Sequence, residues 1–229
     1  MGPPKGWPLH LTYLTSPGRS KFLTKDQQAI ARTKNPDLPV IQAEASQTPY
    51  SNVKITPISN PSHPANGQNG LFASRNLKPG SFILLYLGNV HPESDVEAKK
   101  SDYDLWLDRD AGIAVDAARC GNEARFVNDY RGVKDRPNAE FREVWSVRHQ
   151  ERCMAVFVLP EKKKAAKKMT VGKATATTAT SNAAASPSAG AAGIAKGEEI
   201  LVSYGKGFWG HRIPDGGAVE KEPDIPVLP

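Results

Sequence analysis

Three short segments contain the side chains whose types and spacing could do chemistry. The first is Gly121-Asn-Glu-Ala-Arg-Phe-Val-Asn128-Asp-Tyr, the second is Pro137-Asn138-Ala-Glu140, and the third is Gly197-Glu-Glu-Ile-Leu-Val-Ser-Tyr204-Gly205. They supply a guanidinium group, amides and a phenol, and a phenol at the end of a core strand can orient a reacting group. Each segment alone is a weak signal, because Gly-Glu-Glu is typical of a turn and Arg-Phe-Val-Asn of a strand end. Their order and spacing together make a strong signal.

These segments resemble the SET domain of protein lysine methyltransferases. In that family the Arg-Phe-x-Asn run threads through a loop formed by the last strand and makes a pseudo-knot, which is an exception to the rule that chains do not thread loops. The resemblance implies a mainly β, SET-domain fold of several small sheets with a C-terminal pseudo-knot. It covers residues 53–205, and the chain looks similar to small fungal SET proteins that lack cysteine-rich zinc modules.

The resemblance implies methyl transfer from S-adenosylmethionine to a lysine amine, with Tyr204 as the catalytic residue. Such a transfer is an in-line displacement, so alignment is the main task of the enzyme. The amine must also be uncharged, although the reference pKa of lysine is about 10.4. A cationic sulfonium beside a dry channel favours loss of that proton. The alternative for Tyr204 is a tyrosine that ends a strand with its hydroxyl in solvent.

The segment 66–73, Asn-Gly-Gln-Asn-Gly-Leu-Phe-Ala, looks like the first motif of the family, in which glycine lets the backbone approach the cofactor closely. Gln68 stands where the family usually has another glycine, and Asp129-Tyr130 where it usually has His-Ser. The extra carboxylate could change cofactor affinity. The resemblance implies that the cofactor is bound by Asn69, Gly70, Leu71, Tyr103, Arg125, Phe126, Asn128, Asp129 and Tyr204.

A substrate channel for the lysine is also implied by the resemblance. Its residues would be Tyr86, Phe141, Val202, Phe208 and Trp209. Tyr86-Leu-Gly88 resembles the second family motif, although a buried strand tyrosine before a turn is equally typical. The other four are typical core residues, and only their position beside Tyr204 singles them out. Many family members complete the channel with a zinc module, but no cysteine follows Cys153. We therefore expect Phe208-Trp209 with the residues after them, or the N-terminal arm, to close the channel.

Short β-branched and aromatic runs with turn residues between them predict a domain rich in strands. The expected strands are 53–58, 70–74, 81–87, 112–116, 141–147, 152–159 and 199–204, with turns at Pro79-Gly80 and Gly121-Asn122. Residues 1–50 form an N-terminal extension that we expect to dock on the domain. Its segment Thr24-Lys-Asp-Gln27 has the form of a capping box, which predicts a short helix through Ala31. A second helix is expected at 93–100.

The net charge of +6 comes from one low-complexity segment. Between Glu161 and Lys196 the chain has seven lysines and one glutamate, so the rest of the chain is close to neutral. Residues 161–195 are rich in Ala, Thr, Ser and Lys, and they predict a disordered insertion within the SET domain. The tail, 206–229, is Pro-rich and polar. This charge distribution indicates no specific nucleic-acid site. The lysines at 162–164 and 167–168 resemble a nuclear import signal, although a solvated lysine loop is the commoner explanation for such a run.

Metal and membrane sites are not expected. The five histidines show no ligand spacing, and two cysteines, Cys120 and Cys153, cannot build a zinc site or a disulfide framework. No apolar run approaches the length that crosses a bilayer. We therefore interpret the chain as soluble and not secreted.

The sequence thus predicts a protein lysine N-methyltransferase that uses S-adenosylmethionine, with a histone or nucleosome as the favoured partner and the nucleus, or else the cytoplasm, as its location. The oligomeric state is open. Nothing in the channel residues names a substrate, so ribosomal and other nuclear lysines remain alternatives. A rival hypothesis is a catalytically inactive SET-like binding module in chromatin, which the departures at Gln68 and Asp129-Tyr130 motivate.

Overall fold

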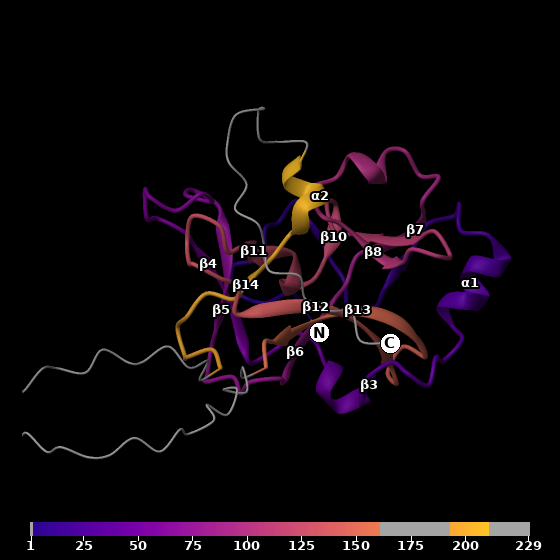
Figure 1. Cartoon of the computed structure of the whole chain (residues 1–229), viewed down its shortest axis with the longest axis horizontal. Coiled ribbons are helices and arrows are strands. Elements are labelled where there is room, and N and C mark those ends of the chain that lie inside the picture. The colour runs from indigo at the N-terminus through magenta and orange to yellow at the C-terminus, as the bar shows by residue number, and fades with distance from the viewer. Residues whose placement is uncertain (1, 161–192, 211–229) are drawn as a thin grey trace, which may run out of the picture.

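The structure is a computed structural model that describes residues 2–160 and 193–210, apart from the side chains of residues 206, 207 and 210 (Figure 1). In this part the strands form two four-stranded sheets and three pairs. The first sheet is β3-β12-β13-β6, made of Val40–Ile41, Ala139–Ser146, Glu151–Val158 and Phe82–Tyr86. The second is β2-β7-β9-β8, made of Gly18–Arg19, Asn89–Pro92, Ile113–Asp116 and Asp104–Asp108.

The three pairs and the helices complete the described fold. The pairs are β1-β10 (Thr12–Tyr13 and Cys120–Gly121), β4-β5 (Val53–Pro57 and Asn69–Ala73) and β11-β14 (Asn128–Asp129 and Leu201–Val202). The α-helices are α1 (Lys25–Ala31) and α2 (Gly205–Gly210). The 3-10 helices are η1 (Ala43–Ser46), η2 (Ala98–Lys100) and η3 (Glu123–Phe126). None of these described helices combines the length and the apolar character of a membrane span.

The sheet β3-β12-β13-β6 is the centre of the molecule because it is buried on both faces. Successive side chains of a strand point to opposite faces. Along β6 and β13, Leu84 and Val156 therefore pack into the main core, while Leu85 and Ala155 pack into a second, smaller core. This explains the nearly continuous apolar runs of these two strands, which a strand buried on only one face does not need.

The N-terminal arm docks on the domain along its length. Its strands β1, β2 and β3 pair in parallel with β10, β7 and β12. The expected capping box is present, since the Thr24 hydroxyl accepts from the Gln27 N–H and the Gln27 side chain accepts from the Thr24 N–H. Trp7 is buried and meets the ring of Phe126 edge-on at 5.6 Å. The N-terminal arm therefore contacts the segment 121–130, which contains the Arg-Phe-Val-Asn run.

The expected strands are present at slightly different bounds, but several expectations about local structure are wrong. Residues 93–100 form only the 3-10 helix η2 at their end, because they have no apolar face to bury and Val96 is exposed. Gly121 lies in β10 instead of a turn, and Asn122 leads into η3. The strand expected at 199–204 is reduced to β14. Before it, Glu199 forms an isolated bridge with Phe72 of β5, and after it, the Tyr204 N–H donates to the Asp129 side chain and not to a strand backbone.

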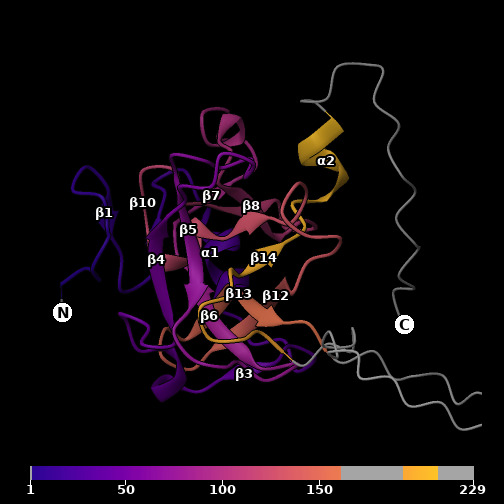
Figure 2. The same ribbon diagram turned by 90° about the vertical axis from the view of Figure 1, so that its left-hand side faces the viewer.

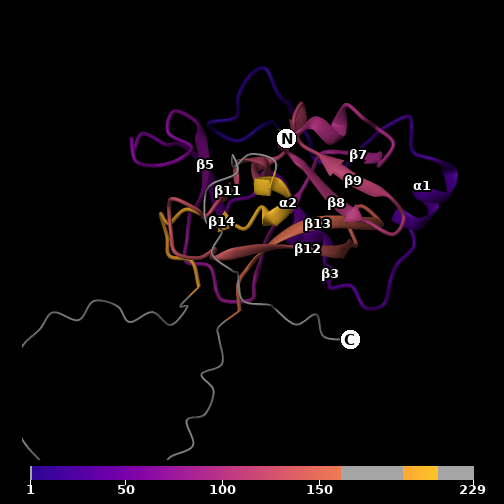
Figure 3. The ribbon, with the colours of Figure 1, turned by 45° about the horizontal axis from the view of Figure 1, so that its top comes forward.

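The pseudo-knot is formed where the last described segment enters the domain. The Ile200 N–H donates to the Leu71 carbonyl of β5, and β14, which begins at the next residue, pairs in parallel with β11. Figure 3 shows β11 and β14 side by side, with α2 directly after them. The segment that contains the Arg-Phe-Val-Asn run is thus held beside the segment that ends in Tyr204.

The insertion expected at 161–195 lies outside the described residues except for its last three positions. Ile194 is fully buried and exchanges two backbone hydrogen bonds with Leu77, at 3.0 and 2.8 Å. The domain therefore resumes at 193 and not at 196. The expected tail, 206–229, is described only as far as 210.

Candidate active site

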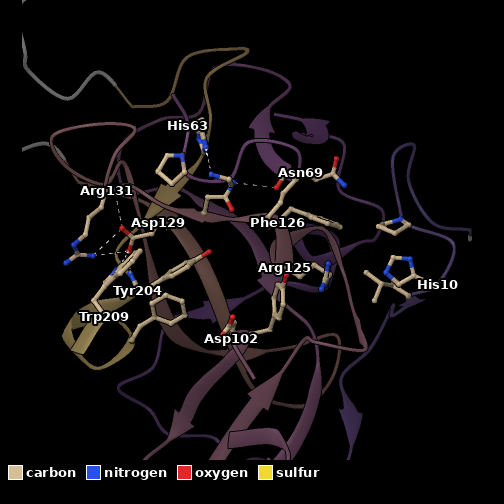
Figure 4. Close-up of a pocket in the computed structure, with 18 residues that line it drawn as sticks. His10, His63, Asn69, Asp102, Arg125, Phe126, Asp129, Arg131, Tyr204 and Trp209 are labelled. Atoms are coloured by element: carbon tan, nitrogen blue, oxygen red, sulfur yellow. Dashed lines mark hydrogen bonds and ion pairs between the residues drawn. The ribbon is translucent and has the colours of Figure 1, made fainter. Parts of the chain in front are cut away.

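A cavity of about 540 Å³ lies where five segments of the chain meet. Figure 4 shows Tyr204 and Trp209 on one side of it and His10 on the other. β1, which begins directly after Leu11, and α2, which contains Trp209, lie on opposite sides of the molecule in Figure 2. The cavity is lined by Pro8, His10, Leu11, His63, Pro64, Ala65, Gln68, Asn69, Asp102, Tyr103, Arg125, Phe126, Asn128, Asp129, Arg131, Tyr204, Phe208 and Trp209.

Tyr204 is positioned at both ends of its residue. Its backbone N–H donates to Asp129 Oδ2 at 2.7 Å, and its hydroxyl donates to the Val127 carbonyl at 2.8 Å. Burial first, and the nearby Asp129 carboxylate second, raise the pKa of the Tyr204 phenol well above its ordinary value. The phenol is therefore neutral at physiological pH. Because its proton is donated to Val127, its lone pairs remain to accept a hydrogen bond from a ligand.

Arg125 joins the aromatic wall of the cavity to the loop after β9. Its guanidinium carbon lies 4.4 Å from the centre of the Tyr103 ring and 5.0 Å from that of Phe126, which places a cation over two aromatic rings. The same guanidinium donates to the carbonyls of Ala117 and Ala118. The two rings are thus held as a rigid apolar surface beside the cavity.

Asn128 is oriented by a buried network that reaches to His63. The His63 Nδ1 accepts from the Ala65 N–H at 3.0 Å, so the ring proton is on Nε2, which donates to Glu199 Oε2 at 3.0 Å. The other oxygen of Glu199 accepts from Asn128 Nδ2 at 2.9 Å. The amide nitrogen of Asn128 therefore faces Glu199, and its carbonyl oxygen points away from that carboxylate.

The Asp129 carboxylate is surrounded by donors of the protein itself. It accepts hydrogen bonds from the Tyr204 N–H, from the Trp209 indole at 3.3 Å, and from the backbone and side chain of Arg131. The side chain of Asp129 is only 6% exposed. Figure 4 shows this group of four residues at one edge of the cavity.

The comparisons with known proteins agree with the resemblance read from the sequence motifs. Residues 68–164 match the sequence model of the SET domain family. The chain contains a SET domain. The mainly β SET-domain fold expected from the sequence is confirmed.

Among the similar solved structures is a humanized mutant of the Chaetomium thermophilum Polycomb Repressive Complex 2 bound to the inhibitor GSK343. It has 20% sequence identity and a TM-score of 0.43, and the likeness covers 67% of this chain and 15% of that one. Another is the same fungal complex in an autoinhibited conformation bound to S-adenosylmethionine, with 21% identity, a TM-score of 0.41, and coverage of 67% and 15%. The chain thus spans about 15% of the length of these chains.

The cavity extends beyond the part of the SET domain that the family match covers. Asn69, Tyr103, Arg125, Phe126, Asn128 and Asp129 lie within the match, and Tyr204, Phe208 and Trp209 follow it. All of these were expected at the site from the sequence. Pro8, His10, Leu11, His63 and Arg131 were not expected there. His63 gave no local signal, since its partner Glu199 is 136 residues away in sequence.

Five residues expected at the site do not line the cavity. Leu71 and Val202 are fully buried in the core, and a Cβ added at Gly70 would lie 2.7 Å from Glu199 Oε1. Gly70 is therefore required by the close approach of Glu199. Tyr86 donates its hydroxyl to the Tyr103 carbonyl at 2.8 Å and meets the ring of Phe141 edge-on at 5.7 Å. A contact of any of the five with a ligand remains a prediction.

The described residues contain no group of three or more His, Cys, Asp or Glu side chains that could hold a metal ion. Within the same residues Cys153 is buried and Cys120 is partly buried, and both are free thiols. Burial raises the pKa of the Cys153 thiol. Because the thiolate is the reactive form, this residue is inert at neutral pH.

Proposed function

We propose that this protein is a protein lysine N-methyltransferase that uses S-adenosylmethionine. The observation that carries the proposal is the neutral, partly buried phenol of Tyr204 in the wall of the cavity that Asn128, Tyr103 and Phe126 also line. A cavity of about 540 Å³ is within the range of small-molecule and cofactor sites. The SET-domain match supports the same reaction class.

The residues of the cavity fit the parts of this cofactor. The Asn128 carbonyl oxygen, directed by Glu199, is an acceptor for an ammonium group, and the rings of Tyr103 and Phe126 offer faces for an adenine base. S-adenosylmethionine, when bound, supplies a methyl group on a cationic sulfonium. Gln68 and Asn69 line the same cavity. The proposed cofactor contacts at Gly70 and Leu71 would be made by their backbone, since these two residues are buried.

Tyr204 would act by orientation and not as a base. Its pKa is raised by burial, so the phenolate is scarce, and its proton is held by the Val127 carbonyl. The phenol oxygen can accept one N–H of a neutral lysine amine and so direct the nitrogen lone pair at the methyl group. The substrate amine itself must be deprotonated, which a low-dielectric channel beside a cation favours.

A basic protein substrate, with a histone as the favoured case, suits the charge next to the cavity. Residues 89–119, which include the cavity residues Asp102 and Tyr103, carry eight acidic and four basic side chains. This excess attracts lysine-rich segments. A histone substrate in turn places the protein in the nucleus. The lysine run 162–164, which resembles an import signal, lies outside the described residues.

The second candidate function is a SET-like binding module without catalysis. It is favoured by Asp129, which lines the cavity at a position where the family usually has histidine. Tyr204 favours the enzyme, because a binding module does not need a phenol fixed at this place.

Isothermal titration calorimetry with S-adenosylhomocysteine tests the cofactor site. We expect wild-type protein to bind this product in the micromolar range and Asn128→Ala to lose most of the affinity. Gln42→Ala, which removes an exposed amide side chain outside the cavity lining, is the matched control and should bind as wild type does. Absence of binding by folded wild-type protein at high micromolar concentration would leave only the non-catalytic function.

A further inference from the structure

We propose that Asp129 is a positioning residue whose carboxylate fastens α2 and Tyr204 to β11 and thereby builds one wall of the cavity. The proposal concerns this chain's own contacts, and it rests on the proposed function only in its consequence for cofactor binding. It assigns a role to the residue at which the sequence departs from the family pattern.

The geometry places one carboxylate between two segments of the chain, 129–131 and 204–209. Asp129 lies in β11, opposite Val202 of β14. Its Oδ2 accepts from the Tyr204 N–H at 2.7 Å and from the Trp209 indole N–H at 3.3 Å. Its Oδ1 accepts from the Arg131 N–H at 2.9 Å. Backbone pairing between β11 and β14 ends at Val202, so the carboxylate continues the attachment where the strand pairing stops.

Arg131 completes the attachment of α2. Its Nη1 lies 3.0 Å from Asp129 Oδ2, and its guanidinium carbon lies 4.9 Å from the ring centre of Tyr130 and 5.8 Å from that of Trp209. The cation therefore lies over two rings while it neutralises the Asp129 carboxylate. A buried carboxylate with an ion-pair partner and three further hydrogen bonds is a stable arrangement, whereas an unpaired one is costly.

The consequence for the cavity follows from the residues that α2 carries. Phe208 and Trp209 both line the cavity, and the Phe208 ring meets Tyr204 edge-on at 4.7 Å. A helix of six residues does not hold its position without tertiary contacts. Without the Asp129 carboxylate, the wall made by Phe208 and Trp209 would be released, and the backbone of Tyr204 would lose its anchor.

Amide hydrogen exchange with Asp129→Asn tests the attachment without any cofactor or substrate. The amide side chain keeps the size of the carboxylate but replaces one accepting oxygen with a donor and removes the charge. We expect exchange in residues 203–210 to rise at least tenfold while the strands β12 and β13 keep their protection. The matched control is Asp110→Asn, which removes an exposed carboxylate and should leave both regions unchanged.

Affinity for S-adenosylhomocysteine, measured as a double-mutant cycle of Asp129→Asn and Trp209→Phe, tests the consequence. We expect about tenfold weaker binding for Asp129→Asn, and the double variant should be no weaker than Asp129→Asn alone, because the indole contributes through Asp129. Two fully additive losses would overturn this step.

The outcomes separate this inference from the proposed function. Wild-type protein that does not bind the product contradicts the function, while a rise in exchange at 203–210 in the same preparation still supports the attachment. Unchanged exchange in folded Asp129→Asn overturns the attachment whatever the affinity. If Asp129→Asn does not fold, Trp209→Phe decides, since it removes the indole donor to Asp129 while it keeps an aromatic ring, and it must raise exchange across α2.

Discussion

At the scale of single residues, the site is built from side chains that hold one another more than from side chains that await a ligand. Asn128, Asp129 and Tyr204 each have a partner in the protein that fixes their orientation. Such preorganisation lets a site bind a ligand without the cost of ordering its own groups. Two of the partners, Glu199 and the Val127 carbonyl, lie outside the cavity lining.

Glu199→Gln should separate the network behind Asn128 from the cavity itself. Glu199 accepts from both His63 and Asn128, and a glutamine must turn its NH₂ group toward one of these donors. We expect a loss of roughly 1–3 kcal/mol in the free energy of unfolding, together with weaker binding of S-adenosylhomocysteine. Chemical denaturation and calorimetry measure the two effects. Glu44→Gln, at an exposed position, is the control, and equal stability of the two variants would contradict the network.

The sequence predicted the cavity residues that lie in the motifs but not the network that orients them. Tyr103, Arg125, Phe126 and Asn128 were identifiable because their spacing follows the family motifs. His63 was not, because a contact across 136 residues leaves no local pattern. Gly70 was expected for an approach of the cofactor, while the structure shows that Glu199 already occupies the space beside it. The sequence therefore predicted that a glycine is needed at position 70, but it did not predict that the side chain of Glu199 is the group that approaches it.

At the scale of elements, side chains replace backbone pairing at two places that position the site. Asp129 does so after β14, and Asn122 does so after β6. Asn122 is fully buried, accepts from the Leu87 N–H at 3.0 Å and donates to the Leu85 carbonyl at 2.8 Å. It thus joins the central sheet to η3, which carries Arg125 and Phe126.

Asn122→Ala should release η3 from β6. Two buried backbone groups would lose their partners, and we expect a loss of roughly 2–4 kcal/mol in the free energy of unfolding. At about 2–4 °C per kcal/mol for a domain of this size, the melting temperature should fall by several degrees or more. Gln42→Ala is again the exposed control. A melting temperature equal to that of the control would show that the Asn122 contacts are dispensable.

The contacts of the Asn122 amide with β6 explain why the turn predicted at Gly121-Asn122 is wrong. A glycine followed by asparagine is typical of a turn, because both residues tolerate turn conformations. Here the pair instead continues from β10 into η3, and the asparagine uses its amide to pair with a distant strand. The helix predicted at 93–100 is also wrong, because the segment has no apolar face that could pack against the core, and only the short 3-10 helix η2 forms at its end.

At the scale of the whole molecule, the charge and the fold reside in different parts of the chain. Excision of residues 162–191, with a short Gly-Ser link in their place, removes six lysines and lowers the net charge from +6 to zero. Pro160 and Gly193, the described residues nearest to the cut, line the same second cavity of about 530 Å³, so a short link can join the two sides. A shorter loop also costs less closure entropy.

We expect this deletion to leave the melting temperature and the product affinity nearly unchanged. Attraction to acidic partners such as nucleosomes should weaken, and added salt should reduce the difference between the two proteins. Thermal melting and binding at two salt concentrations measure these effects. Deletion of 162–195 is the comparison, because it also removes Ile194, and it should be clearly less stable. A marked fall in the melting temperature of the shorter deletion would show that the excised residues support the fold.

Methyl transfer to lysine, with Tyr204 as the orienting residue, is best tested by comparing the methylation rates of wild-type protein and Tyr204→Phe. Wild-type protein and Tyr204→Phe are incubated with methyl-labelled S-adenosylmethionine and recombinant histones, and methylated lysine is quantified by mass spectrometry. We expect labelled lysine from wild type and a rate about 100- to 1000-fold lower for Tyr204→Phe, which corresponds to an increase of about 3–4 kcal/mol in the activation free energy. Affinity for S-adenosylhomocysteine should change little. An equal rate of methylation for the two proteins would contradict the proposed role of Tyr204 in methyl transfer.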